Sequence, residues 1–512
     1  LPTKVVSMAY IFPAIIHRLE SYLIALDACE LLHLQIRPDL ALEALTKDTD
    51  ISKHNIRDGI QFQRGMGNNY ERLEFLGDCF LKMATSISLF GRLPRDNEFE
   101  SHVNRMLLTS NKNLMKNAIQ LKLFKYIRSQ SFNRRDWYPE GPVLLEGKPA
   151  KATSSHDLAD KTIADVCEAL IGAALLSFHD SKNMDMAVRA VTELVCSEDH
   201  SVSSFADYYK LYTKPGYLNQ PPSQKELQLA SFTEKQHPYK FNYPRLLASA
   251  FTHPSFPRSF NGNIPSYQRL EFLGDALLDM VCINYLFHNS PGKDPQWLTE
   301  HKMAMVSNMF LGALCVHLGF NKHLLVWNSS FMQNIRDYVD DITEARAQVE
   351  KDAIDAGKSP EDCAPDYWMS VRQPPKCLPD IVEAYIAAIF VDSQYNFSEV
   401  ERFFDTHIAW FFRDMSVYDT FARNHATTSL SVFLESTMRC HAWSIKVGEP
   451  INLGEKSPII VMIIIHKTVI THAAAESSRY AKVIAAKKAL EMLEGITPEE
   501  YKKKYECNCH SN

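Results

Sequence analysis

The sequence predicts a mainly α-helical protein built from two copies of one all-helical module, followed by a small α-β-β-β-α domain. The repeat rests on two observations. The phrase "YERLEFLGD" (70–78) recurs as "YQRLEFLGD" (267–275), and an Asp-x-x-Glu-Ala stretch follows each copy. The last domain rests on a third observation, because three strand-like runs lie between two helical runs after residue 416.

Composition limits the class of protein. The 512 residues, 46% hydrophobic and 23% charged, are typical of a globular chain with several domains. No apolar run approaches the roughly 20 residues of a membrane helix, and residues 1–30 lack a secretion signal, so we expect no membrane partner. Most of the eleven Cys lie singly in apolar helical patterns, which predicts reduced thiols in the cytoplasm or nucleus.

The elements follow in order along the chain. Residues 1–38 are expected to form a lead-in connector helix, 39–199 the first module, 200–240 a linker, 241–415 the second module, and 424–512 the last domain. Asp78 and Asp165 are 87 residues apart, whereas Asp275 and Asp380 are 105 apart. The second copy has therefore gained 18 residues, and the polar, acidic stretch near 328–375 is the expected insertion, a partly helical loop.

Paired carboxylates recur in both copies at helical spacing. Acids three or four residues apart share a face of a helix, and these lie among Leu, Ile, Val, Phe and Ala, where an acid needs compensation. The eight are Glu74, Asp78, Asp165 and Glu168 in the first copy, and Glu271, Asp275, Asp380 and Glu383 in the second.

Two interpretations compete for these acids. Each could pair with a nearby base, and Arg72, Arg269 and Lys82 are available. The bases are too few for four acids in each copy, so a site for a hard divalent cation such as Mg²⁺ is favoured. Such an ion lowers the pKa of a water and stabilises charge on a phosphate. Gly77 and Gly274, in mid-helix, predict close approach by another helix.

The phrase "ERLEFLGD" with a downstream "DVCEALIGA" resembles the ribonuclease III family, Mg²⁺-dependent endonucleases of double-stranded RNA. The resemblance implies that the eight acids are the catalytic ligands of Mg²⁺, or Mn²⁺, in two centres. The second copy also has "AFTHPSF" (250–256), similar to the family's upstream Thr-His segment, whereas the first copy has only "EALTKDTD" (43–50).

Two such modules before a small αβββα domain resemble the C-terminal part of the Dicer family, and specifically fungal Dicers. This implies an intramolecular pseudo-dimer in which each centre cuts one strand of an RNA duplex by hydrolysis, leaving short 3′ overhangs, in RNA silencing or antiviral defence. Double-stranded RNA is the expected substrate, and double-stranded-RNA-binding proteins or Argonaute proteins are the expected protein partners. The alternatives are a nuclear microRNA-precursor processor and a non-catalytic duplex-RNA scaffold.

The final domain has a helix, 477–493, similar to the last helix of double-stranded-RNA-binding domains. That resemblance implies contacts to RNA phosphates by Arg479, Lys482 and Lys487. From residue 424 onward, eleven Lys and Arg stand against nine Glu, so the domain is only weakly basic. A protein-contact domain with the same fold is the alternative.

The C-terminal tail, "YECNCHSN", is either an unstructured segment with free thiols or part of a metal site. In a β-meander the start of the first strand, the end of the second and the end of the last helix share one edge. That edge would bring together Cys440, His466, Cys507 and Cys509 as a Cys₃His zinc site. His441 and His510 are less favoured ligands and His472 should lie opposite. Some fungal Dicers are similar in having such a structural zinc site.

Overall fold

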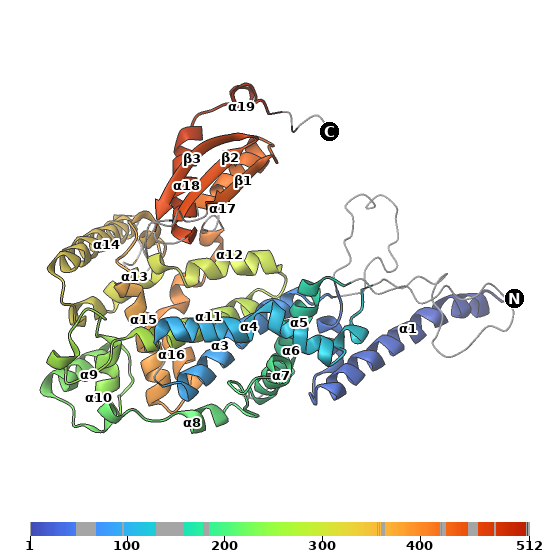
Figure 1. Cartoon of the computed structure of the whole chain (residues 1–512), viewed down its shortest axis with the longest axis horizontal. Coiled ribbons are helices and arrows are strands. Elements are labelled where there is room, and N and C mark those ends of the chain that lie inside the picture. The colour runs from blue at the N-terminus through green and yellow to red at the C-terminus, as the bar shows by residue number, and fades with distance from the viewer. Residues whose placement is uncertain are drawn as a thin grey trace. The chain divides into compact units, whose positions relative to one another are not determined.

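A computed structural model describes residues 2–47, 68–94, 97–129, 158–177, 184–355, 357, 359, 364–419, 421, 426–448, 459–475, 478–507 and 509 (Figure 1). The chain divides into two compact units. The first unit comprises residues 1–298 and 305–413, and the second comprises 299–304 and 414–512. No described helix is long and apolar enough to cross a membrane.

The chain begins with a 29-residue helix, α1 (Thr3–Leu31), which leads into the first module. Only the C-terminal half of α1 has buried residues. The helices of the first module are α2 (Pro38–Ala44), α3 (Glu71–Arg92), α4 (Glu98–Thr109), α5 (Asn111–Gln120), η2 (Leu123–Tyr126), α6 (Asp160–Leu176) and α7 (Asp185–Val195). The expected linker is itself partly helical, with α8 (Asp207–Leu211), η3 (Gly216–Asn219) and α9 (Gln224–Gln236).

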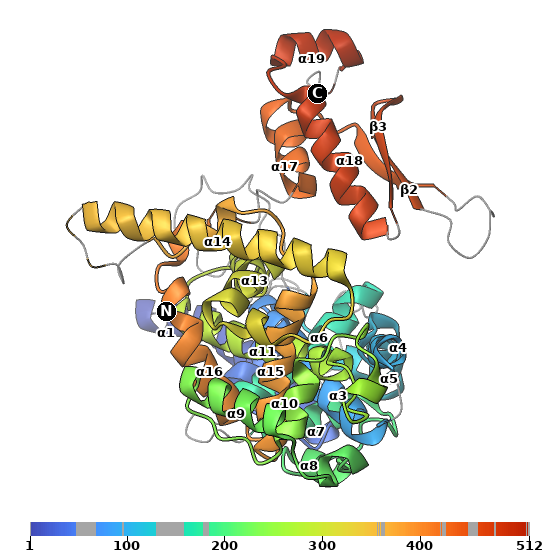
Figure 2. The same ribbon diagram turned by 90° about the vertical axis from the view of Figure 1, so that its left-hand side faces the viewer.

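The second module repeats this plan. Its helices are α10 (Pro244–Ala250), η4 (Arg258–Phe260), α11 (Gln268–Asn289), α12 (Pro295–Met305), α13 (Asn308–His317), η5 (Phe320–His323), α14 (Ser329–Asp355), η7 (Tyr367–Ser370), α15 (Cys377–Asp392), α16 (Phe397–His407) and η8 (Ala409–Phe412). The expected insertion contains α14, a long helix anchored by the buried Tyr338 and Ile342, and η7 (Figure 2).

Close backbone approach joins the two central helices of each module. A Cβ atom on Gly77 would lie 1.7 Å from the Glu168 carbonyl oxygen, and one on Gly172 would lie 2.3 Å from that of Leu73. In the second module a Cβ on Gly274 would lie 1.9 Å from the Glu383 carbonyl oxygen. Helices α3 and α6, and likewise α11 and α15, therefore pack backbone to backbone, which brings the acids of each pair face to face.

The two modules pair through α3 and α11, and the contacts are reciprocal. Arg72 of α3 donates to the carbonyl oxygen of Ser290 beyond the end of α11, and its guanidinium lies 4.6 Å from the Phe287 ring centre. Its counterpart Arg269 donates to the carbonyl oxygens of Leu93 (2.8 Å), the position equivalent to Ser290, and of Phe90 (3.0 Å), and lies 5.0 Å from the Phe90 ring centre. Each arginine thus caps the C-terminal end of the other module's helix, where a cation is favoured. These arginines are therefore engaged across the interface.

The second unit contains the expected three-stranded antiparallel sheet, in the order β1 (Trp443–Val447), β2 (Ile459–Ile465) and β3 (Thr468–Ala475). Trp443 pairs with Ile465, so the start of β1 lies beside the end of β2. The helices of this unit are η9 (Met415–Tyr418), α17 (Ala426–Val432), η10 (Phe433–Thr437), α18 (Ser478–Leu493) and α19 (Pro498–Tyr505). The small helix α19 was not foreseen.

Candidate catalytic centres and a candidate zinc site

The first candidate centre lies where α3 and α6 approach. Carboxylate oxygens of Glu74, Asp165 and Glu168 lie within 4.8 Å of one another, and both α6 acids are buried. Asp78, one turn after Glu74, is exposed and lies outside this trio, although its charge still acts on Glu168. Three of the four predicted acids therefore converge on one point, with the fourth beside them.

The second candidate centre has the same arrangement between α11 and α15. Oxygens of Glu271, Asp380 and Glu383 lie within 4.8 Å of one another. The fourth acid, Asp275, is held by the first module instead, since Lys82 Nζ lies 2.9 Å and Arg105 3.7 Å from its carboxylate. Bases of the other module therefore hold this predicted ligand.

Burial and mutual repulsion raise the pKa values of the glutamates in both centres. Burial, and then the neighbouring Asp165, raise the pKa of Glu74 to about 7. Burial, and then Asp78, raise the pKa of Glu168 to about 9. In the second centre burial and Asp380 raise the pKa of Glu271 to about 8, and burial and Asp275 raise the pKa of Glu383. Clustered carboxylates of this kind fit a divalent cation, which offsets both causes.

A lysine four residues before the central aspartate contacts each trio. Lys161 Nζ lies 3.0 Å from the carboxylate of Asp165 and 3.7 Å from that of Glu74. Lys376 Nζ lies 2.7 Å from the carboxylate of Glu271 and 3.2 Å from that of Asp380. Both ammonium groups are largely exposed, so solvent weakens these pairs. Because both lysines precede the central aspartate by four residues, this shared spacing could have identified them from the sequence.

A tyrosine opens the repeated phrase and reaches each centre. Tyr267 donates its hydroxyl to Asp380 at 3.0 Å, and Tyr70 donates to Asp165 at 3.4 Å. A hydrogen bond to a carboxylate leaves that group oriented toward the cluster. Both tyrosines are part of the repeated phrase, but the spacing of the acids does not predict that a tyrosine bonds the central aspartate.

Two grooves, one at the first centre and one near the second, are each lined by residues of both modules. The groove at the first centre is lined by Glu71, Glu74, Asp294, Pro295 and Gln296. The groove near the second is lined by Asn97, Glu98, Phe99, His102 and Gln268. The start of α12 therefore borders the first centre and the start of α4 borders the second, so the two grooves are both composite.

The segment "EALTKDTD" of the first module, which has no close sequence match to the Thr-His segment of the second, takes the same backbone position at Thr46. Thr46 pairs with Arg128 as Thr252 pairs with Leu325, in isolated parallel bridges. The backbone amide of Tyr70 donates to the carbonyl of Thr46 at 3.0 Å, as Tyr267 does to Thr252 at 3.0 Å. The backbone role is retained, although Lys47 replaces the histidine.

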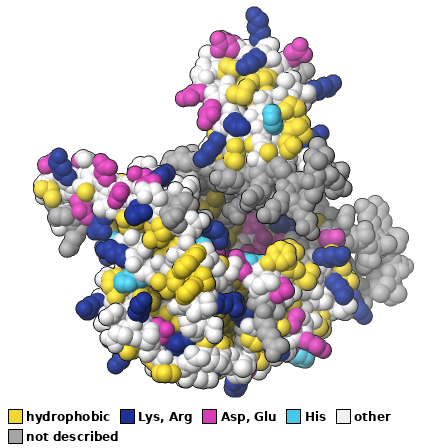
Figure 3. Space-filling model, turned by 60° about the vertical axis from the view of Figure 1, so that its left-hand side comes forward, with side chains coloured by type: hydrophobic (Ala, Val, Ile, Leu, Met, Phe, Trp, Pro, Cys, Tyr) yellow, Lys and Arg dark blue, Asp and Glu magenta, His cyan; other side chains and the backbone are white. Residues whose placement is uncertain are grey.

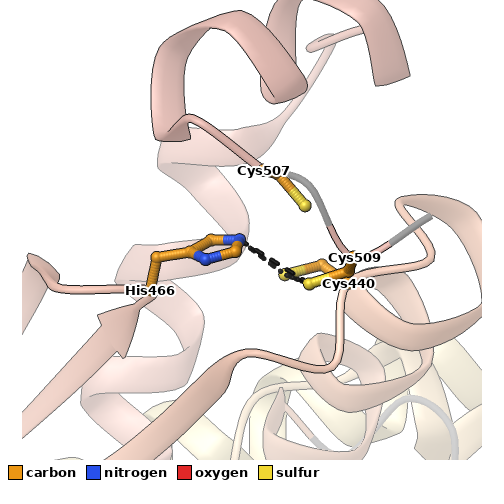
Figure 4. Close-up of side chains that lie close together, drawn as sticks. All are labelled: Cys440, His466, Cys507 and Cys509. Atoms are coloured by element: carbon orange, nitrogen blue, oxygen red, sulfur yellow. Dashed lines mark hydrogen bonds between the residues drawn. The ribbon is translucent and has the colours of Figure 1, made fainter. Parts of the chain in front are cut away.

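The predicted Cys and His residues of the second unit converge at one edge of its sheet (Figure 4). Cys440 Sγ lies 3.6 Å from His466 Nε2, and Cys509 Sγ lies 3.8 Å from the same nitrogen and 3.9 Å from Cys440 Sγ. Cys507 is buried within the same cluster. The edges of a tetrahedron around Zn²⁺ are roughly 3.6 Å between N and S and roughly 3.8 Å between S and S.

Left-handed backbone surrounds this cluster. Arg439, directly before Cys440, has φ 50°, His466 itself has φ 52°, and Glu506, before Cys507, has φ 50°. Such conformations are costly in residues other than glycine and tend to persist where the surrounding structure requires them. His472, by contrast, is exposed and pairs with Met462 in mid-strand, away from the cluster.

The predicted RNA contacts lie on α18. Lys487 is exposed and Lys482 is partly buried, and the side chain of Arg479 lies outside the described residues. Figure 3 shows Lys and Arg side chains interspersed with Asp and Glu on the displayed face of the second unit. The structure therefore brings these residues to one helix without a strongly basic surface in that view.

The chain is similar in sequence to known families and proteins. The family model described as ribonuclease III domain matches residues 71–179 and 268–394, and that described as dsRNA binding domain matches 418–495. The chain is 52% identical to Dicer-like protein 1 of Neosartorya fischeri and 49% identical to that of Chaetomium globosum, in each case over 99% of this chain. It spans 33% of the length of each of these relatives. A structure of Dicer from Pichia stipitis is 21% identical, with a TM-score of 0.19 over 48% of this chain and 92% of that one.

Proposed function

The chain belongs to the ribonuclease III family, with two such domains and a double-stranded-RNA-binding domain, and from this premise we propose that it is the catalytic part of a Dicer-type endoribonuclease. Its substrate is double-stranded RNA, and each centre hydrolyses one strand. The observation that carries the proposal is the occurrence of two equivalent carboxylate trios, related by the α3–α11 pairing, in one chain. A duplex has two strands to cut and the chain has one acidic centre for each.

In the proposed reaction the converged trios Glu74, Asp165, Glu168 and Glu271, Asp380, Glu383 hold Mg²⁺ or Mn²⁺. Asp78 and Asp275, which lie beside the trios, are proposed to complete the two ligand sets. Such an ion supplies charge stabilisation on the phosphate and an acidified water. The protein keeps the carboxylates converged through the Gly77 and Gly274 contacts. Tyr70 and Tyr267 orient the central aspartates, and the exposed Lys161 and Lys376 neutralise part of the excess negative charge.

Hydrolysis is proposed to release the 3′ oxygen and leave a 5′-phosphate, with the two cuts offset to give short 3′ overhangs. Purified protein incubated with Mg²⁺ should cleave duplex RNA and leave a single-stranded control intact. The double substitution Glu74→Gln with Glu271→Gln should bind duplex but cut neither strand. Binding without cleavage by the unsubstituted protein would support the scaffold alternative instead.

The second unit is proposed to bind duplex RNA through Arg479, Lys482 and Lys487, and to carry a structural Zn²⁺ on Cys440, His466, Cys507 and Cys509. The donor set suits that ion, because thiolate and imidazole ligands favour zinc over Mg²⁺. Zinc would tie the tail to the sheet edge. The described cysteines are free thiols, which is consistent with a cytoplasmic or nuclear location. Argonaute or double-stranded-RNA-binding proteins are the proposed partners.

A further inference from the structure

The interface between the modules has a pseudo-twofold axis that passes near the middle of α3 and α11. The reciprocal contacts of Arg72 and Arg269 define it, because these residues are 197 apart in the sequence and make the same contacts in opposite directions. Residues near such an axis meet their own counterparts. The counterpart of Lys82 under the same offset is Asp279.

Lys82 and Asp279 do meet, and they carry opposite charges. The Lys82 ammonium group bonds the carboxylate of Asp279 and, at 3.1 Å, also bonds that of Asp275. The side chain of Asp279 is 7% exposed and that of Lys82 is 24% exposed, so the pair is largely shielded from solvent. Burial lowers the pKa of Lys82, but the carboxylates of Asp279 and Asp275 outweigh it and raise the pKa above its ordinary value.

If each module paired with a copy of itself, the contact between Lys82 and Asp279 would be replaced by a contact between like charges. Two first modules would place Lys82 against Lys82, and two second modules would place Asp279 against Asp279. The other charged positions that contact this ion pair do not discriminate, because 78 and 275 are both Asp and 105 and 302 are both basic. Their interactions therefore cancel when two like pairs exchange into two unlike pairs, so within this group of charges the axis position makes the difference.

We propose that Lys82 and Asp279 select the partner at the catalytic interface, making the first module complementary to the second and not to a copy of itself. Like charges placed together at a protected interface are strongly unfavourable, and specificity is commonly built by making the wrong pairing unfavourable. Tethering in one chain already favours intramolecular pairing by raising the effective concentration. The axis pair adds a preference that would also act between two chains. The inference rests on the pairing of the modules and not on nuclease activity.

A charge-reversal cycle in the full chain tests the contact. Lys82→Asp and Asp279→Lys should each lower the folding equilibrium constant, measured by urea unfolding, at least about tenfold. The double reversal should recover it to within about threefold of the unsubstituted chain. The ion pair between Asp341 and Arg372 (2.7 Å, both side chains about half exposed) is the matched control within one module, and reversing either partner there should cost less than about threefold. If the double reversal is as unstable as the two single reversals combined, the proposal is wrong.

Co-expression tests partner selection itself. A Lys82→Asp chain has Asp at both axis positions, and an Asp279→Lys chain has Lys at both. When the two chains are co-expressed with different affinity tags, opposite charges meet only if the first module of each chain pairs with the second module of the other. Tandem purification should recover a two-chain complex from this mixture, with light scattering giving its mass. Controls with both tags on the unsubstituted chain, or both on Lys82→Asp, should give no such complex. If the complementary chains stay apart, the pair stabilises without selecting, and the proposal fails. Neither readout involves RNA, so an inactive nuclease would leave this result interpretable.

Discussion

The contact between Gly77 and α6 offers a direct test of how the first centre is assembled. In Gly77→Ala the added Cβ would lie 1.7 Å from the carbonyl oxygen of Glu168 and 2.9 Å from the backbone nitrogen of Gly172. Both neighbours are backbone atoms of a buried helix, so no side-chain rotation can relieve the clash. Helices α3 and α6 must move apart.

The magnitude follows from the distances. Ordinary Cβ contacts begin near 3.4 Å, so α6 would need to shift by more than 1 Å along this line. Overpacking costs about 1–3 kcal/mol, occasionally more, and rigid backbone puts this site at the upper end. Alanine recovers about 1 kcal/mol of helix propensity over glycine. We expect a net loss of about 2 kcal/mol or more in the free energy of unfolding.

Gly91→Ala, on the same helix, is the matched control. Its Cβ would lie 3.4 Å from the nearest atom, the Cβ of Leu211, which is ordinary contact. This variant should be neutral or gain up to about 1 kcal/mol. Urea unfolding followed by circular dichroism measures both. If Gly77→Ala is as stable as Gly91→Ala, the backbone approach of α3 and α6 does not assemble the centre as described.

Two other predictions concern metal binding. In EDTA the free energy of unfolding should fall as the pH rises from about 7 to about 9, because Glu168 and Glu271, with pKa values of about 9 and 8, retain protons that the unfolded chain has lost. Each retained proton contributes about 1.4 kcal/mol per pH unit, so the fall should be roughly 2–3 kcal/mol per unit near pH 7 and about 1 kcal/mol per unit or less near pH 9. Mg²⁺ should flatten that slope, and a slope that is flat or rising in EDTA contradicts the assigned burial. Native mass spectrometry should find one Zn²⁺ per chain; Cys440→Ser should lose it and lower the melting temperature of the second unit, whereas His472→Asn should keep it. Equal zinc content in both variants would count against the ligand set.

The sequence alone predicted the features that depend on local spacing, several of which recur in both modules. The helical spacing of acids predicted clusters of four in each copy, and three of the four converge in each. The mid-helix glycines predicted the close approach that the Cβ distances describe. The strand order and the register of Trp443 with Ile465 follow from a meander, and they account for the edge that gathers Cys440 and His466. Local pattern was enough because these features depend on spacing within one element or between neighbouring elements.

Contacts between the modules were not predictable in this way. The pairing of Lys82 with Asp275 joins residues 193 positions apart, and no local pattern distinguishes it from a pair within one helix. The equivalence of the first module's segment 43–50 with the Thr-His segment could not be predicted from sequence, because a lysine follows Thr46 where the second copy has His253. The equivalence lies in backbone hydrogen bonds. Helix α19 could have been found, since Thr497 and Glu500 form a capping box directly before a polar run.

The most direct measurement of the central claim assigns each centre to one strand. A duplex RNA labelled at a different end on each strand is incubated with Mg²⁺ and with Glu74→Gln or Glu271→Gln protein. The account predicts that each variant loses the cut in one strand, that the two variants lose different strands, and that the remaining cut keeps its position. A variant that loses both cuts, or neither, would contradict two independent centres joined across one interface.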